Sequence, residues 1–182
     1  VGGGAMNAAS GLYATVGGGY GNAAQGEYSI IGGGQNNLTS SGFAGVGGGN
    51  QNTASGGMAH VGGGEQNTAS GGWAVTGGGS GNSASGLAAG VLGGSTNTAS
   101  GSFASVGGGF GNTTSAAYTT IAGGGRSNPA DAATGNRVTD DYGSVGGGGN
   151  NRAGDASGAT DDRPYATVAG GYGNVASGSY AT

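Results

Sequence analysis

The stretch from Gly56 to Gly71 reads GGMAHVGGGEQNTASG, and its pattern returns fifteen residues earlier and fifteen residues later. A unit normally opens with Val or Ile and three glycines. It continues with two variable residues, an Asn and a run of small residues, and it closes with an aromatic residue, Ala and one more residue. A fixed period of this length is typical of a solenoid or a fibre, in which each repeat stacks on its neighbours. The repeat therefore decides the fold before any local motif is considered.

Repeats of this kind fill the whole chain. Eight units of fifteen residues occupy 1–120, two longer units of 24 and 23 residues occupy 121–167, and a last unit of fifteen occupies 168–182. We therefore expect a single repeat domain over 1–182. Reading from Thr182 into Val1 would repeat the junction between two interior units, and neither end carries an atypical capping unit. This predicts end-to-end junctions at Val1 and Thr182, either within a longer chain or between subunits.

Each unit can hold two short strands, because apolar and polar residues alternate with period two. The alternation places Ala14 and Val16 on one face of the first strand, and Asn22 and Ala24 on one face of the second. Glycines are expected at the corners, where the backbone needs a positive φ or a close approach. The sequence thus predicts an all-β fold, a β-solenoid or β-roll of about eleven stacked 15-residue coils, two of them with longer loops. Stacking at about 4.8 Å predicts a rod roughly 50 Å long, filled by Ala, Val and an Asn ladder.

Composition excludes several functions. Of 182 residues, 52 are Gly, only two are Pro and none is Cys, and the formal net charge is −4. The glycines follow no Gly-X-Y triplet, so collagen is excluded, and the regular period argues against disorder. Without a basic patch or a long apolar span we expect no nucleic-acid partner and no membrane insertion. Since His60 is the single histidine and no Gly-Lys-Ser/Thr occurs, we expect no enzyme, no catalytic residue and no cofactor site.

One position of the repeat, three residues before the first residue of the next unit, usually holds a large apolar side chain. We call these residues the aromatic column. Ala88 is the one gap in this column. Its other members are Tyr13, Tyr28, Phe43, Met58, Trp73, Phe103, Tyr118, Tyr142, Tyr165 and Tyr180. We expect the column to face outward and to be the assembly surface, buried against other copies in a trimer or a laterally packed fibre, because exposed apolar patches mark interfaces. Two alternatives stay open, a stacking surface for sugars and burial inside a wider coil.

Charged residues gather in the two long units. All four arginines lie there, with six of the eight acidic residues: Arg126, Arg137, Arg152, Arg163, Asp131, Asp140, Asp141, Asp155, Asp161 and Asp162. The two units align loosely, Asn128 and Asp131 with Asn151 and Asp155, and Asp140-Asp141 with Asp161-Asp162, so we expect the loops to stack side by side. Carboxylates brought together need Arg partners or a hard cation with oxygen ligands. Arg pairing and a calcium site both stay open, whereas a catalytic acid pair is disfavoured.

Hydroxyl residues form two further rows. These are Thr53, Thr68, Ser83, Thr98 and Thr113 and, two positions on, Ser55, Ser70, Ser85, Ser100 and Ser115. Such rows can order water on an ice-binding face, or they can solvate a sheet and cap turns. Asn37 and Asn112 begin glycosylation sequons, but both belong to the expected inward Asn column, so we expect them to be unmodified.

The pattern Gly-x-Tyr-Ala-Thr-Val-Gly-Gly-Gly-x-x-Asn-x-Ala-Ser-Gly resembles the head repeats of trimeric autotransporter adhesins and the glycine-rich repeats of tail-fibre-like proteins of bacteria and phages. In the adhesin heads, slightly shorter units form a left-handed β-roll that trimerises, whereas this chain has an extra residue and a triple glycine. The resemblance covers the whole chain. It implies an extracellular, non-enzymatic, adhesive or structural fibre.

We therefore expect a structural subunit or segment of an extracellular or cell-surface filament, which self-assembles through its in-register ends and its aromatic column. The partners are then other copies of the chain. Two alternatives remain: a trimeric adhesin or phage tail-fibre segment that binds a host surface or a glycan, and an ice-binding solenoid.

Overall fold

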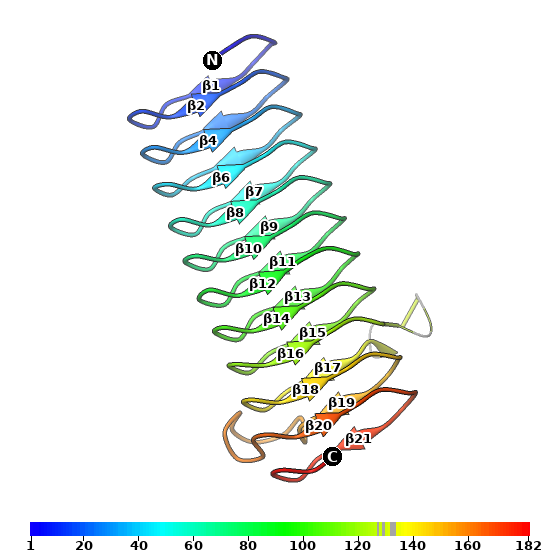
Figure 1. Cartoon of the computed structure of the whole chain (residues 1–182). Coiled ribbons are helices and arrows are strands. Elements are labelled where there is room, and N and C mark those ends of the chain that lie inside the picture. The colour runs from blue at the N-terminus through cyan, green and yellow to red at the C-terminus, as the bar shows by residue number, and fades with distance from the viewer. Residues whose placement is uncertain (127, 129, 132–133) are drawn as a thin grey trace.

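In the computed structural model the chain is a parallel β-solenoid, seen in Figure 1 as a column of stacked coils. The structure describes residues 1–126, 128, 130–131 and 134–182. Each coil gives one two-residue strand to each of two parallel sheets, which hold eleven and ten strands among the described residues. The predicted all-β solenoid of fifteen-residue coils is confirmed.

The odd-numbered strands form the eleven-stranded sheet. They are β1 (Ala8–Ala9), β3 (Ala23–Ala24), β5 (Leu38–Thr39), β7 (Thr53–Ala54), β9 (Thr68–Ala69), β11 (Ser83–Ala84), β13 (Thr98–Ala99), β15 (Thr113–Thr114), β17 (Arg137–Val138), β19 (Arg152–Ala153) and β21 (Val175–Ala176). The even-numbered strands form the ten-stranded sheet. They are β2 (Thr15–Val16), β4 (Ile30–Ile31), β6 (Gly45–Val46), β8 (His60–Val61), β10 (Val75–Thr76), β12 (Gly90–Val91), β14 (Ser105–Val106), β16 (Thr120–Ile121), β18 (Ser144–Val145) and β20 (Thr167–Val168).

Each strand pairs in register with the equivalent strand of the next coil. In regular coils the partners are fifteen residues apart, as Ala54 and Ala69 are. The register survives both long coils, because Thr114 pairs with Val138 and Val145 pairs with Val168. The extra residues therefore leave the coil as loops and do not shift the face that each strand presents to the core.

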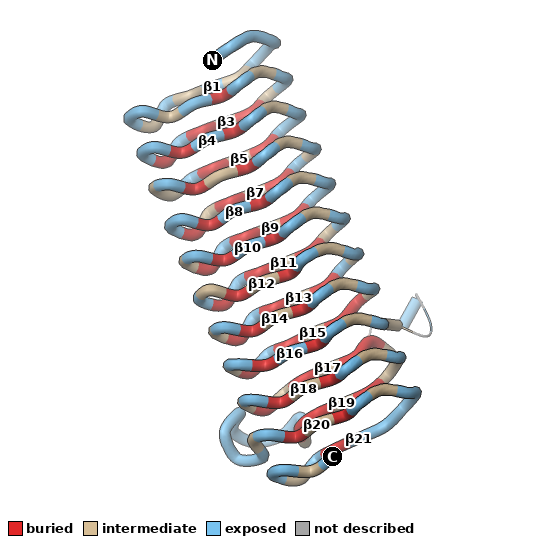
Figure 2. The backbone as a smooth tube through the Cα atoms, viewed as in Figure 1, coloured by how far each residue is buried: buried red, intermediate tan, exposed pale blue. Residues whose placement is uncertain are grey.

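The core is a thin column of small side chains between the two sheets. In Figure 2 the buried residues are red along the backbone of each coil. The even sheet supplies mostly Val and Ile, and the odd sheet supplies mostly Ala and Thr. Ile31, Val46 and Ala54 are at most 1% exposed. Because the inward residues have short side chains, the two sheets lie close together, as the sequence predicts. Each buried Val or Ile contributes about 1.5–3 kcal/mol through the hydrophobic effect.

A ladder of buried asparagines lines one corner of the coil. The Asn67 amide nitrogen donates to the carbonyl oxygens of Gly63 (2.9 Å) and Gly79 (2.8 Å), and its amide oxygen accepts from the backbone nitrogen of Asn82 (2.9 Å). One side chain thus bonds to three backbone groups. Two ladder members begin the glycosylation sequons, and both are at most 1% exposed: Asn37 and Asn112.

The Asn ladder also runs through the long coils, as Asn136 and Asn151. The predicted alignment of Asn128 with Asn151 is therefore wrong, because Asn136 holds the ladder position and Asn128 lies in the loop before it. The correct match was readable from the sequence, since Asn136 stands six residues before Tyr142, as Asn67 stands six residues before Trp73.

Glycine is required at one corner position of every coil, the fourth residue of the unit. Gly64 has a φ of 86°, and a Cβ added there would overlap the carbonyl oxygen of Gly79 in the next coil. The expectation that glycines hold the positive-φ corners is only partly right. Two more positions in most coils have positive φ, and one of them carries the aromatic column, as at Tyr13 with a φ of 59°.

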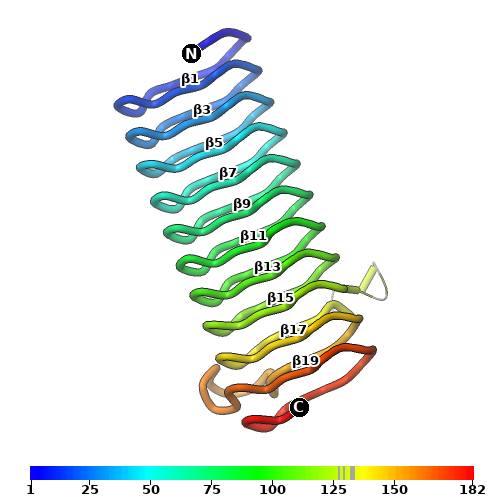
Figure 3. Tube along the Cα trace, in the orientation of Figure 1, coloured from blue at the N-terminus to red at the C-terminus, as the bar shows by residue number. Residues whose placement is uncertain are grey.

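Val1 and Thr182 lie in the two end coils, at opposite ends of the column (Figure 3). Among the described residues, no helix has the length and the apolar character that crossing a membrane requires.

Candidate functional site

The aromatic column occupies the turn that joins each odd strand to the following even strand. In the second coil this turn closes when the Ser29 backbone nitrogen donates to the Gly26 oxygen (3.2 Å), with Tyr28 just before Ser29. The left-handed φ of Tyr28, 55°, aims its backbone nitrogen at the preceding coil, where it donates to the Leu12 oxygen (2.8 Å). All eleven members of the column, including Ala88, share this positive φ. One turn geometry thus fixes the direction of the whole column.

The rings form two stacked runs on the outside of the solenoid. Tyr13, Tyr28 and Phe43 make the first run, with ring centroids 4.8 and 5.0 Å apart. The second run holds Phe103, Tyr118, Tyr142, Tyr165 and Tyr180, with centroids 4.8–5.1 Å apart and ring planes within 12° of parallel. The ten large side chains of the column are 43–74% exposed. The column therefore faces outward as predicted, and the alternative of burial inside a wider coil is wrong.

Between the two runs the stacking of the aromatic column is interrupted. Met58 and Trp73 follow Phe43, and Ala88 then leaves one coil without a large side chain. Met58 and Trp73 line a shallow apolar hollow together with Gly57 and Gly72. The break lies in the side chains alone, because the Ala88 backbone nitrogen still donates to the Gly72 oxygen (2.8 Å).

Aromatic residues at this turn carry a conformational cost. A left-handed φ costs a residue with a Cβ about 1–2 kcal/mol, and glycine would avoid the cost. An aromatic pair gains about 0.5–1.5 kcal/mol beyond its buried area, so stacking roughly offsets the strain. The rings keep much of their surface in water, as Tyr13 does at 66% exposed. The local energetics of a single chain thus give little reason for rings at this position.

Stacking also limits what the rings can bind. Sugars pack on the face of an aromatic ring, and in an unbroken run each inner face is covered by the next ring at about 5 Å. Tyr142, for example, has a ring stacked on each side, Tyr118 and Tyr165. The accessible part of an inner ring is its edge. This geometry favours side-by-side packing against another protein surface over stacking of sugars.

The two loops of the long coils leave the solenoid at different corners, as Figure 1 shows. The first loop lies between β16 and β17, on the glycine-rich side, and the second lies between β19 and β20, on the aromatic side. The prediction that the loops stack side by side is therefore wrong. The alignment of Asp140-Asp141 with Asp161-Asp162 is wrong too, because the first pair stands in the ordinary turn just before Tyr142. The spacing between the ladder Asn and the column residue carries this information, because it is six residues from Asn67 to Trp73 and from Asn136 to Tyr142 but fourteen from Asn151 to Tyr165.

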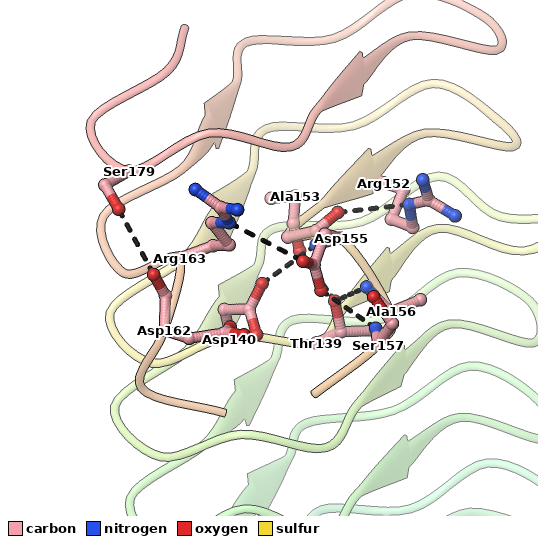
Figure 4. A network of polar contacts seen from close by, with 11 residues as sticks. Thr139, Asp140, Arg152, Ala153, Asp155, Ala156, Ser157, Asp162, Arg163 and Ser179 are labelled. Carbon is pink, nitrogen blue, oxygen red and sulfur yellow. Dashed lines mark hydrogen bonds and ion pairs between the residues drawn. The ribbon is translucent and has the colours of Figure 1, made fainter. Parts of the chain in front are cut away.

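Three of the six predicted carboxylates nevertheless converge. Asp140 comes from the turn after β17, whereas Asp155 and Asp162 come from the second loop, and oxygens of all three lie within 4.8 Å of one another (Figure 4). The Asp155 backbone nitrogen donates to Asp140 Oδ2 (2.9 Å), and Asp155 Oδ1 accepts from the Ser157 backbone nitrogen (2.8 Å). We call these three residues the acidic cluster.

Burial and charge act together on Asp140, which is 2% exposed. Desolvation raises the pKa of its carboxyl above the ordinary value of 3.8, and the nearby charges of Asp155, Asp162 and Asp141 raise it further. The hydrogen bond from the Asp155 backbone opposes this rise. Arg163 compensates part of the charge, with its Nε 3.6 Å from Asp155 Oδ2. Because Arg163 is half exposed, this ion pair is weak.

The other charged residues are placed elsewhere. Asp141 accepts from the Ala117 backbone nitrogen (2.8 Å), Asp131 lies in the first loop, and Asp161 is exposed. Arg126 lies over the Phe110 ring at 5.0 Å, and Arg152 donates to the Gly154 oxygen (3.1 Å). The six predicted carboxylates thus do not form one site. The acidic cluster offers three carboxylates, and calcium takes six to eight oxygen ligands, so further oxygens would be needed for such an ion.

The hydroxyl rows lie on the odd sheet, where part of them serves the backbone. Ser100 donates to the Thr114 oxygen (3.1 Å) and Ser115 donates to the Val138 oxygen (3.4 Å). These bonds link successive coils and support the turn-capping interpretation of the rows. His60, which the sequence leaves without a role, is exposed and lies over Gly45 beside a shallow groove.

Comparison with protein-family models gives no match, and a search of curated proteins gives no significantly similar sequence. The fold is a β-solenoid, and its function has to be inferred from its own surfaces.

Proposed function

We propose that this solenoid is a structural segment of an extracellular or cell-surface fibre, and that the aromatic column is its lateral assembly surface. The observation that carries the proposal is the exposed ladder of rings, which stands at a strained backbone position where glycine would fold more easily. Packing against a second copy would bury the ring edges and supply the stabilisation that a single chain lacks.

The backbone supports a mechanical role. Parallel strand pairing, the Asn ladder and the ring stacks all run along the same axis, so load along the rod is shared by many in-register bonds. Both end coils carry the odd strand of the interior coils, as β1 and β21, and coils of the same kind can stack on them at Val1 and Thr182. Such stacking extends a rod in the manner of cross-β structures.

A trimeric adhesin or tail-fibre segment is the second candidate. It is favoured by the repeat pattern, because the motif Tyr-Ala-Thr-Val-Gly-Gly-Gly, which begins at Tyr13, resembles the repeats of adhesin heads. In that case the column packs at the centre of a three-chain rod, and the loops of the long coils face a host surface or a glycan. An ice-binding role is the third candidate, and the hydroxyls that bond the backbone weaken it.

Electron microscopy of the purified chain, with analytical ultracentrifugation across a wide concentration range, tests the proposal. Laterally associated rods or filaments are expected. Discrete three-chain rods would instead favour the adhesin candidate, and a chain that stays monomeric at high concentration would overturn both.

A triple variant locates the interface. Changing Tyr118, Tyr142 and Tyr165 to Asn removes three stacked rings, and Asn tolerates the left-handed φ. Association is expected to be lost. The matched control is Ile30→Thr, which removes an apolar side chain of similar exposure, 55%, outside the column and is expected to associate normally. Equal loss of association in both variants would contradict the ladder as the interface.

A further inference from the structure

We propose that the tyrosine run at the C-terminal end of the ladder is a site of oxidative cross-linking, at which neighbouring coils become joined through dityrosine. Four members of the second run in succession are tyrosines: Tyr118, Tyr142, Tyr165 and Tyr180. Their consecutive ring centroids are 5.0, 4.8 and 5.0 Å apart, with ring planes 3°, 12° and 7° from parallel. The site is a modification site, and it does not depend on the fibre function proposed above.

The geometry holds the reacting atoms close together. The rings are related by the rise of one coil, so equivalent ring atoms of neighbours are separated by about the same 5 Å as the centroids. The carbons beside each hydroxyl group are the ones that couple in dityrosine. Each side chain lies on the surface, from 43% exposed at Tyr165 to 74% at Tyr180, so rotation about its Cα–Cβ and Cβ–Cγ bonds can close the remaining distance. Exposure also lets an oxidant reach the phenols.

The reaction balances with a peroxide as the oxidant. Hydrogen peroxide, acting through a haem peroxidase, takes one electron and one proton from each of two phenols and is reduced to two water molecules. The two phenoxyl radicals form one carbon–carbon bond between the ring carbons next to their oxygens. The hydrogen on each of these carbons then moves to the phenol oxygen, which restores both aromatic rings. The product has lost two hydrogen atoms in total.

The stacked rings make coupling of two tyrosines within one chain faster than coupling between chains. A phenoxyl radical on Tyr142 has a tyrosine ring stacked on each face, so its partner is present at a high effective concentration. Tyr20 provides the contrast, because it is also exposed, at 47%, but its neighbours in the adjacent coils are Ala5 and Gln35. A link between Tyr142 and Tyr165 closes a loop in the unfolded chain and stabilises the fold as a disulfide does.

The experiment uses the full chain at low concentration with horseradish peroxidase and hydrogen peroxide, followed by trypsin and mass spectrometry. Cleavage after Arg126, Arg137 and Arg152, combined with a glutamate-specific protease that cleaves after Glu27 and Glu65, places Tyr20, Tyr118, Tyr142 and Tyr165 on four different peptides. We expect linked peptides joining Tyr118 to Tyr142 and Tyr142 to Tyr165, dityrosine fluorescence, and a higher melting temperature for the cross-linked chain.

The matched variant is Tyr142→Phe, which keeps the ring, the stack and the backbone angle but removes the phenol. It is expected to lose both links of Tyr142 and to keep a link between Tyr165 and Tyr180. Absence of linked peptides from the wild-type chain, while N-acetyltyrosine couples in the same mixture, would overturn the proposal. Links from Tyr20 as frequent as those within the ladder would overturn it too. Because the readout is within one chain, it is independent of whether the chain assembles into fibres.

Discussion

The regular coils of 1–120 and the long coils of 121–167 share one backbone ladder but differ in what they carry outside it. In the regular coils the only charged residues are Glu27 and Glu65, whereas the long coils hold all the arginines and the acidic cluster. Strand pairing is the same in both, since Arg137 pairs with Arg152 in the register that joins Thr53 to Thr68. Strand pairing and the Asn ladder therefore carry the fold, and either corner of a coil can release a loop without disturbing them.

The largest loss of stability is expected from changes in the Asn ladder. They test whether the ladder is equally important in the regular and the long coils. Asn67→Ala in a regular coil and Asn136→Ala in a long coil each remove three hydrogen bonds to the backbone. Two backbone groups lose their partner in each variant, because the Gly79 and Gly148 oxygens keep a backbone donor. We expect each change to lower the free energy of unfolding by about 4 kcal/mol, since every unsatisfied group costs about 1–3 kcal/mol. Thermal unfolding followed by circular dichroism measures this loss.

The control is Asn174→Ala in the last coil, where the side chain is exposed and bonds to Gly170. Its loss is expected to be much smaller. If Asn136→Ala lowered the free energy of unfolding as little as Asn174→Ala, the Asn ladder would not contribute equally through the long coils.

A smaller effect is expected from the corner glycines. Gly64→Ala places a Cβ against the Gly79 oxygen at a φ of 86°, so we expect a loss of about 3 kcal/mol from strain and overlap together. Gly57→Ala is the matched change in a neighbouring turn, where an added Cβ meets no atom within 4 Å. It should leave the melting temperature nearly unchanged, and equal melting temperatures of the two variants would contradict the close approach at Gly64.

The smallest effect concerns the acidic cluster and its pH dependence. Because burial raises the pKa of Asp140 in the folded chain, the folded state binds the proton more tightly than the unfolded state does. Stability from this group is therefore greatest below its ordinary pKa of 3.8, and it declines as the pH rises through the higher folded value. Asp140→Asn is expected to remove this decline and to change stability at neutral pH by less than about 1 kcal/mol.

Unfolding of wild type and Asp140→Asn at several pH values between acidic and neutral measures this difference. Parallel pH profiles of the two proteins would show that Asp140 does not titrate abnormally. Adding calcium chloride at neutral pH distinguishes the two ways in which the carboxylate charges can be compensated, by a bound calcium ion or by arginine. A calcium-dependent rise in melting temperature that Asp140→Asn abolishes indicates a cation, whereas no response indicates compensation by Arg163 and solvent.

Much of the fold was predictable because the repeat encodes it residue by residue. The inward positions of Val16, Ala24 and Asn37 follow from period-two alternation within a fixed unit, and the outward Tyr13 follows from its place in an exposed apolar column. The acidic cluster was predictable only in part. Its three residues belong to the charged segment that the sequence singles out, but the other three candidate carboxylates lie outside the cluster.

The sequence alone determined the coil, its length in residues and its columns, because each of these depends on spacing along one chain. Only the tertiary structure decided which carboxylates of the long coils meet, with Asp140 brought to Asp155 and Asp131 left in the other loop. It also decided that Tyr13 and its equivalents take a left-handed backbone. From Tyr28 onward the backbone nitrogen at this position bonds to the preceding coil, and residue spacing within one unit does not contain such contacts between coils.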